Sequence, residues 1–190
     1  MASSQLKELI DLLARESYFE RTVTLSSGRT SNYYLDCRRT LMLPRGAFLA
    51  GELLIDLVTA AGVAQVGGMA AAAIPVTDAI LAAAFRRNLE LTGFFVRKQT
   101  KQHGLQQRIE GAFRAGVATA IVEDTVTTGG SSVDAAAAAR EAGADVTCVI
   151  ALVDRGEGGA EAFAKAGLAY RFLVSADDLR LAHQRLKQSR

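Results

Sequence analysis

The residues best suited to chemistry lie in one short run, EDTVTTGGS at positions 123–131. An apolar stretch ends there in two adjacent acids, and threonines, glycines and a serine follow before a predicted helix. Free N–H groups at a helix N-terminus bind anions, and glycines let an anion approach the backbone closely. The run is not a P-loop, because no lysine follows the glycines. It predicts a binding site for a phosphate group.

The acids Glu123 and Asp124 need a second explanation, because two carboxylates would repel a bare phosphate. Carboxylates accept hydrogen bonds from sugar hydroxyls, or they face a Mg²⁺-bound ligand. A phosphorylated sugar would therefore suit both parts of the run. The structural alternative is that Ser131 caps the helix, with Asp134 reaching back as a capping-box acid. Capping alone leaves the two acids unexplained.

A second run, Arg97 to Arg108, also carries Lys98, Lys101 and His103 but contains no acid. Cations at this density repel one another unless an anion binds among them. The run contains a glycine and follows a predicted strand, which is typical of an exposed loop. A solvated basic loop and an RNA-binding loop are the alternatives. Beside a phosphate site, a ligand with several negative charges is the better explanation.

A third candidate is Arg155, in the run VDRGEGG that follows another predicted strand. Its guanidinium could bind a substrate carboxylate through two parallel hydrogen bonds. The alternative is an ion pair of Arg155 with Asp154 or Glu157 inside the turn.

Beyond residue 45, short β-prone runs alternate with alanine-rich helical segments, which predicts an α/β fold with a central, mostly parallel sheet flanked by helices. Ligands gather beyond the carboxyl ends of the strands in such a sheet, where all three runs would emerge. The expected strands are 65–69, 91–96, 117–122, 146–153 and 169–174, and the expected helices are 45–61, 76–87, 132–142, 160–166 and 177–187.

The first 40 residues differ from this pattern and predict a small subdomain beside the sheet. Leu6, Leu9, Ile10 and Leu13 share one face of a helix, and two short β-prone runs follow around a turn at 26–29. The length of 190 residues fits one domain. We expect a subdomain over about 1–40, an α/β core over about 45–175 and a last helix over about 177–188.

Composition restricts the class of protein further. Lys and Arg (22) nearly balance Asp and Glu (20), so the chain has no overall positive field that would favour nucleic acid. No apolar run reaches the ~18 residues of a membrane span, and the charged start is unlike a signal peptide, so we expect a cytoplasmic protein without a membrane segment. Cys37 and Cys148 are far apart and are expected to be small buried residues.

Taken together, these runs resemble the orotate phosphoribosyltransferase family of type I phosphoribosyltransferases. The 123–131 run is similar to the signature that binds 5-phosphoribosyl 1-diphosphate (PRPP) across the superfamily. RKQTKQHG at 97–104 resembles the catalytic loop of the orotate enzymes, and SGRTSNYY at 27–34 resembles their early substrate-side segment. The run around Arg155 matches as well, so the resemblance covers nearly the whole chain.

The resemblance implies transfer of the phosphoribosyl group from PRPP to orotate, which gives orotidine 5′-monophosphate and diphosphate in pyrimidine (UMP) biosynthesis. Glu123 and Asp124 would hold the ribose hydroxyls, and residues 127–131 would bind the 5′-phosphate. The implied catalytic residues are Lys101, His103 and Asp124. The implied PRPP site comprises Arg97, Lys98, Lys101, His103, Glu123, Asp124, Thr125, Val126, Thr127, Thr128, Gly129, Gly130 and Ser131. Orotate would contact Thr127, Arg155 and the backbone around Tyr34 and Leu35.

The resemblance also implies a cofactor and an assembly. Mg²⁺ would be held mainly through PRPP, with no direct protein ligand. The chain would form a homodimer in which the loop of one subunit reaches the active site of the other, without nucleic acid or membrane partners.

Two rival functions stay open at this point. One is transfer to a purine or a different pyrimidine. Arg155 and the Tyr33-Tyr34 segment speak against it, because they favour a base that bears a carboxylate. The other is a non-catalytic regulator that senses PRPP and binds RNA or DNA. The chain departs from the family's pattern in two places: Ser26 stands where many members have lysine, and alanines fill 70–73, a turn that usually contains glycine.

Overall fold

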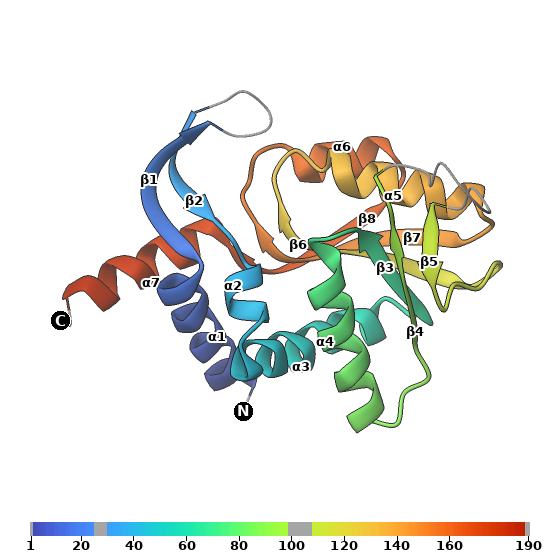
Figure 1. Ribbon diagram of the computed structural model, residues 1–190, viewed down its shortest axis with the longest axis horizontal. Helices are drawn as coiled ribbons and strands as arrows, with labels where there is room; N and C mark the ends of the chain where they lie inside the picture. The colour runs from blue at the N-terminus through green and yellow to red at the C-terminus, as the bar shows by residue number, and fades with distance from the viewer. Residues whose placement is uncertain (1, 25–29, 99–107, 189–190) are drawn as a thin grey trace.

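A six-stranded sheet forms the centre of the structure (Figure 1). The structure, a computed structural model, describes residues 2–24, 30–98 and 108–188. The strand order is β5-β4-β3-β6-β7-β8, and every neighbouring pair is parallel except the antiparallel pair β4 and β5. The strands are β3 (Gln65–Met69), β4 (Thr92–Val96), β5 (Ile109–Gly111), β6 (Ala118–Val126), β7 (Asp145–Asp154) and β8 (Ala169–Ser175).

Helices cover both faces of the sheet, as Figure 1 shows. On one face, α3 (Pro44–Ala60) and α4 (Ala73–Arg86) bury their apolar sides in a core cluster that we call the α3-side core. On the other, α5 (Gly130–Glu141) and α6 (Gly159–Lys165) bury alanines and Phe163 in a second cluster, the α5-side core. The α/β class with a mostly parallel sheet flanked by helices is confirmed, and each expected strand and helix of the core is present within a few residues.

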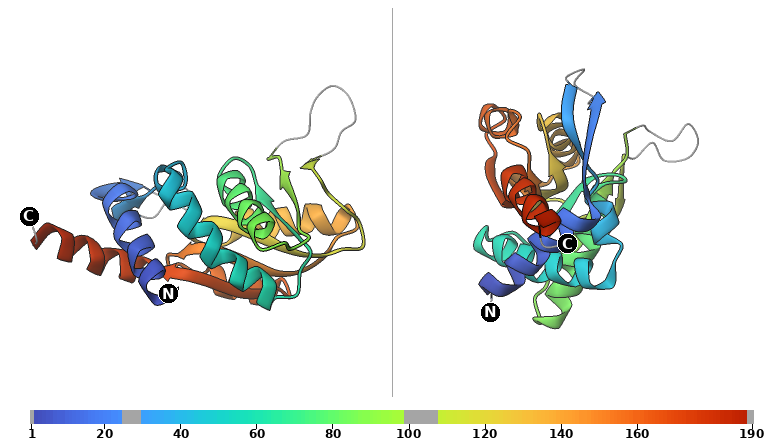
Figure 2. Two further views of the ribbon diagram at one scale, coloured as in Figure 1. Left: turned by 90° about the horizontal axis from the view of Figure 1, so that it is seen from below. Right: turned by 90° about the vertical axis from the view of Figure 1, so that its left-hand side faces the viewer.

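The N-terminal region forms the expected subdomain. Helix α1 (Ala2–Glu16) buries Leu9 and Leu13 completely, and the antiparallel hairpin β1 (Tyr18–Thr24) and β2 (Thr30–Leu35) follows it. The last helix, α7 (Ala176–Gln188), packs against α1 at the end of the molecule (Figure 2). Two short elements were not expected from the sequence, α2 (Arg38–Leu41) and β5, because four and three residues are too few to show a period.

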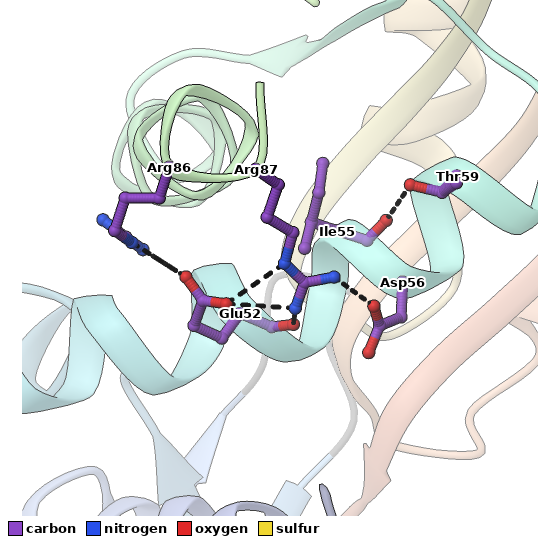
Figure 3. Close-up of polar contacts among 6 residues, drawn as sticks. All are labelled: Glu52, Ile55, Asp56, Thr59, Arg86 and Arg87. Atoms are coloured by element: carbon purple, nitrogen blue, oxygen red, sulfur yellow. Dashed lines mark hydrogen bonds and ion pairs between the residues drawn. The ribbon is translucent and has the colours of Figure 1, made fainter. Parts of the chain in front are cut away.

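An ion-pair cluster fastens α3 to α4 (Figure 3). Arg86 donates to Glu52 over 2.6 Å, and Arg87 donates to both the carboxylate and the backbone carbonyl of Glu52. Arg87 also pairs with Asp56 one turn further along α3. This cluster holds the carboxyl end of α4, while the opposite end of the same helix starts just after β3.

No helix in the described ranges is long and apolar enough to cross a membrane. Cys37 and Cys148 are buried free thiols, as expected. Burial raises the pKa of Cys37, so this thiol stays protonated at neutral pH.

Candidate active site

The three candidate runs start from carboxyl ends of parallel strands, so their first residues lie along one edge of the sheet. Arg97 follows β4, Thr127 follows β6, and Arg155 follows β7. Strand order reverses between β3 and β6, because the chain runs from β3 to β4 on one side and later places β6 on the other. Loops diverge at such a switch point and leave a crevice for a ligand. The edge by β3 and β6 is therefore the candidate site.

Strand β6 continues past both acids, which corrects the expectation that it ends at Val122. It pairs with β7 as far as Val126 and Asp154, so the ladder supports the strand through Glu123 and Asp124. Both acids are buried, with exposed fractions of 3% and 8%. They are thus held within a paired strand, whereas the sequence placed them at the end of an apolar run, just before the turn.

Glu123 fixes the start of helix α5. Its Oε2 accepts hydrogen bonds from the hydroxyls of Ser131 and Ser132, each at 3.0 Å. Burial raises the pKa of Glu123, and these two donors partly offset that effect. Ser132 was not among the expected site residues, although it directly follows the predicted run in the sequence. The capping-box alternative is wrong: the N-cap is Gly129, with no side-chain cap, and Asp134 pairs with Arg108.

Asp124 lies where the alternation of β6 shifts by one residue. Val122 belongs to the α3-side core, and a regular strand would place Val126 on that face as well. Val126 instead lies in the α5-side core, while the Thr125 hydroxyl donates to Cys37 Sγ at 3.2 Å on the α3 side. The shift follows Asp124, whose carboxyl interacts electrostatically with Cys37 and Arg38 on the α3 side of the sheet.

The carboxyl of Asp124 is strongly perturbed. Burial and the neighbouring Glu123 raise its pKa to about 7, while the charge of Arg38 acts in the opposite direction. Arg38 is itself held by Asp36 through two hydrogen bonds, of 2.8 and 3.1 Å. Sequence analysis missed this pair, since a D-x-R spacing in a short loop carries no specific signal. At neutral pH the site therefore holds a carboxyl poised between its charged and neutral forms.

The turn between β6 and α5 has the geometry of an anion site. Gly129 has φ +79° at the N-cap, and a Cβ there would lie 2.8 Å from the Phe163 ring. Only glycine meets both constraints. The first helical bond runs from Val133 N–H to Gly129 O, so the preceding N–H groups have no helical acceptor. Thr128, Gly130 and Ser131 are exposed, and Thr127 is half-buried.

The ends of the basic run are fastened by acids from elsewhere in the chain. Arg97 Nη1 donates to Glu110 at 2.9 Å, and Arg108 donates to Asp134 at 2.7 Å. The backbone N–H of Arg97 also donates to the carbonyl of Arg108 at 2.7 Å. The expectation of unneutralised cations is therefore wrong for these two arginines. Lys98 is exposed at the edge of the site.

Two expected site residues, Lys101 and His103, lie outside the described residues, as do the turn positions 26–29. The structure therefore neither places them nor removes them from the site.

Arg155 is buried between the sheet and the N-terminal hairpin, with 3% of its side chain exposed. Its Nε donates to Glu157 at 2.7 Å, which confirms one of the pairings considered from the sequence. Its Nη2 donates to Ser31 Oγ at 3.1 Å, and its guanidinium lies over the Tyr33 ring, 4.4 Å from the centroid. The hairpin therefore supplies contacts to Arg155 from residues more than a hundred positions earlier.

The remaining predicted positions, Tyr34 and Leu35, end strand β2 of the same hairpin. Leu35 is buried, and the Tyr34 ring lies under the guanidinium of Arg21 at 4.4 Å. The hairpin thus brings the predicted base-side segment to the strand ends that carry the acids. No three His, Cys, Asp or Glu side chains within the described residues gather closely enough to hold a metal ion.

This arrangement can bind an anionic, hydroxyl-bearing ligand. Buried carboxylates can accept hydrogen bonds from hydroxyls, the open start of α5 is suited to a phosphate, and a buried arginine on the next strand is suited to a carboxylate.

Similar proteins carry names that agree with this chemistry, although no protein-family model matches the chain. The orotate phosphoribosyltransferase of Rhodopirellula baltica is 43% identical over 186 residues, which cover 95% of this chain and 96% of the relative. That of Mycobacterium avium is 42% identical over 181 residues, covering 95% and 99%. The Mycobacterium tuberculosis orotate phosphoribosyltransferase, solved in complex with PRPP, superimposes with a TM-score of 0.79 at 37% identity, over 93% of this chain and 99% of the other.

Proposed function

This chain belongs to the orotate phosphoribosyltransferase family, and we propose that it transfers the phosphoribosyl group of PRPP to orotate in the crevice beside β3, β6 and β7. The observation that carries the proposal is the placement of two buried acids, an open helix N-terminus and a buried arginine on neighbouring strand ends. Each group matches one part of the two substrates. The product is orotidine 5′-monophosphate, a precursor of pyrimidine nucleotides.

PRPP is proposed to bind along β6 and the start of α5. Asp124 accepts hydrogen bonds from the ribose hydroxyls, together with the oxygen of Glu123 that the serines leave available. Residues 127–131 bind the 5′-phosphate through their backbone N–H groups and hydroxyls. Because Glu123 also holds Ser131 and Ser132, it fixes the phosphate-binding turn relative to the sugar.

The diphosphate of PRPP is proposed to meet the basic run. Lys98 is exposed beside the site, Arg97 keeps donors beyond its contact with Glu110, and Lys101 and His103 complete the set. The bond between ribose C1 and diphosphate breaks with its electron pair on the leaving oxygen, so cations there stabilise the developing charge. A ring nitrogen of orotate then forms the new bond to C1 and gives up its proton to the diphosphate or to water, and no protein nucleophile is required.

Mg²⁺ is proposed to bind mainly through phosphate oxygens of PRPP. The described residues fit this mode, since they offer carboxyls at Glu123 and Asp124 but no three-ligand cluster. When bound, the ion supplies charge neutralisation for the leaving diphosphate. Asp124, with a pKa near neutrality, becomes more readily ionised beside a cation.

Orotate is proposed to lie between the hairpin and the end of β7. Arg155 binds its carboxylate, Thr127 contacts the ring, and the backbone at Tyr34 and Leu35 supplies the remaining polar contacts. A buried guanidinium discriminates strongly between bases, because a base without a carboxylate leaves the donors of Arg155 that face the substrate without an acceptor.

A homodimer is proposed to join at the face formed by α2, α3 and α4. An apolar groove of about 510 Å³ opens there, between Met42, Phe48 and Ile74 among others. Met42 is 74% exposed and Phe48 is 36% exposed, which is costly in water for an unpartnered groove. Ile74 belongs to the first turn of α4, directly after β3, so a partner seated here would lie next to the active site. Light scattering on Phe48→Glu should show a shift to monomer.

The assay that tests the function follows the absorbance change with orotate, PRPP and Mg²⁺, and repeats it with uracil, hypoxanthine and adenine. We expect consumption of orotate alone. Consumption of a purine without consumption of orotate would overturn the assignment.

A further inference from the structure

We propose that Tyr33 is a positioning residue for Arg155 and thereby sets how tightly the site holds the carboxylate of its substrate. The inference rests on the proposed function, because Arg155 is the group assigned to that carboxylate. It assigns a role in substrate recognition to a side chain of the N-terminal hairpin.

The guanidinium of Arg155 is held from three directions. Tyr33 covers one of its faces, with Cζ 4.4 Å from the ring centroid. Glu157 accepts from Nε at 2.7 Å, and Ser31 accepts from Nη2 at 3.1 Å. A guanidinium has five N–H donors in a fixed plane, and these two bonds account for two of them. The ring of Tyr33 sets the orientation of that plane, so it sets where the other donors point.

Tyr33 is in turn part of a stacked column. Its ring is nearly parallel to that of Tyr18, at 5.1 Å and 13°. Tyr18 contacts His183 of α7 at 5.0 Å, and His183 Nδ1 is bonded to the carbonyl of Ala14 in α1 at 2.9 Å. The ring of Tyr33 therefore cannot shift without disturbing both the first and the last helix, which makes it a rigid support.

The chemistry of the support matters as well as its rigidity. Glu157 neutralises part of the charge of Arg155, whereas a neutral ring attracts a cation through its electron-rich face and leaves the positive charge intact. Burial raises the pKa of Tyr33, so its hydroxyl stays neutral at physiological pH. Tyr33 thus orients Arg155 without weakening the attraction between Arg155 and an incoming carboxylate.

The other cation–π contacts of the hairpin differ from that of Tyr33 and Arg155 in how exposed the cation is. Phe19 and Tyr34 face Arg21 and Arg39, whose side chains are exposed to solvent. An exposed cation–π contact is weak, whereas a desolvated one is stronger. The pair of Tyr33 and Arg155 is the buried member of this group, which is why we assign the role to it.

The test measures the Michaelis constants for orotate and PRPP in Tyr33→Leu, Tyr33→Phe and the wild type. Loss of the ring should raise the constant for orotate about fivefold, equivalent to ~1 kcal/mol, and leave that for PRPP nearly unchanged. Tyr33→Phe keeps the ring but loses a hydroxyl that also interacts with Arg155, so its orotate constant should lie much closer to that of the wild type than to that of Tyr33→Leu. Phe113→Leu removes a ring of comparable packing, 5.2 Å from Phe94, and controls for general loosening.

A double-mutant cycle with Arg155→Ala separates positioning from packing. If Tyr33 acts through Arg155, Tyr33→Leu should have no further effect on the orotate constant in the Arg155→Ala background. A trifluorinated phenylalanine at position 33 preserves the shape of the ring but weakens its negative face, so it should raise the orotate constant even if Tyr33→Leu fails to fold.

Three results would overturn the inference. Tyr33→Leu could change the Michaelis constants for orotate and PRPP equally, it could raise the orotate constant as much in the Arg155→Ala background as in the wild type, or the fluorinated ring at position 33 could leave the orotate constant unchanged. A wild-type protein that does not use orotate would instead refute the proposed function, so the two failures are distinguishable.

Discussion

Replacement of Asp124 by asparagine should make the free protein more stable at alkaline pH and a poorer binder of PRPP. Burial and Glu123 raise the pKa of this carboxyl to about 7 from an ordinary value of 3.8. The folded chain therefore binds the proton of Asp124 more tightly than the unfolded chain does. Its contribution to the free energy of unfolding is largest at low pH, declines as the pH rises from about 4 to about 7, and is lost above that. Asparagine is neutral throughout and avoids this decline.

The size of the effect follows from the same numbers. At 1.36 kcal/mol for each factor of ten in proton affinity, the full difference is roughly 4 kcal/mol above pH 7. The coupling to Glu123 is shared between the two acids, so we expect a gain of about 2–4 kcal/mol for Asp124→Asn at alkaline pH and close to none at about pH 4.

Urea denaturation of both proteins, at about pH 4 and about pH 8.5, measures this difference directly. Asp145→Asn removes a carboxylate from the exposed start of β7 and controls for the change in net charge. Addition of PRPP and Mg²⁺ should then stabilise the wild type more than Asp124→Asn, since the free energy that a ligand adds to stability grows with the logarithm of its affinity. The reasoning fails if Asp124→Asn is less stable at alkaline pH, or if its gain is the same at both pH values.

Three further predictions concern the other parts of the site. Arg155→Ala should raise the Michaelis constant for orotate by about tenfold or more and that for PRPP little, because its guanidinium matches a carboxylate; equal changes would make it a residue of the turn only. Lys101→Ala should lower kcat by a larger factor than it lowers the affinity for substrates. If sites are shared between subunits, mixing Lys101→Ala chains with Asp124→Asn chains should restore activity. With subunit exchange confirmed separately, a lack of recovery would mean that each chain completes its own site. Gly129→Ala should cost about 2 kcal/mol or more in unfolding experiments, through its positive φ and the ring carbon 2.8 Å from the added methyl, whereas Gly130→Ala, with open space around it, should cost far less.

Much of the fold could be predicted from periodicity, because the core of this chain alternates strand and helix with clear apolar patterns. The predicted strand at 65–69 coincides with β3, whose five residues are all buried. The end of β6 could not be found in this way. In the sequence, Glu123 and Asp124 mark the end of an apolar run. In the structure, pairing with β7 continues the strand through both acids, and hydrogen bonds from Ser131 and Ser132 partly offset the burial of Glu123. Tertiary partners of this kind are not visible in a local pattern.

The acids, the glycine turn and Arg155 were predicted as site residues because their spacing follows from local geometry. Their partners were harder to predict. Glu110 and Asp134 neutralise the arginines at the ends of the basic run, and Ser31 contacts Arg155 from 124 positions away. These contacts depend on which segments the sheet brings together, and a single sequence does not show this.

The position of β3 between β4 and β6 has a consequence for the synthesis of the chain. Residue Gln65 pairs with Thr92, which is made soon after it, and with Thr119, 54 positions later. A nascent chain that has not reached β6 carries an unpaired edge on β3, the strand that later borders the proposed active site, and open edges can pair with other chains. The contact between Ser31 of the hairpin and Arg155 forms later still, because it requires Arg155 to have left the ribosome. Incomplete chains should therefore be prone to aggregation and degradation, and binding competence should appear only when nearly the whole protein has been made.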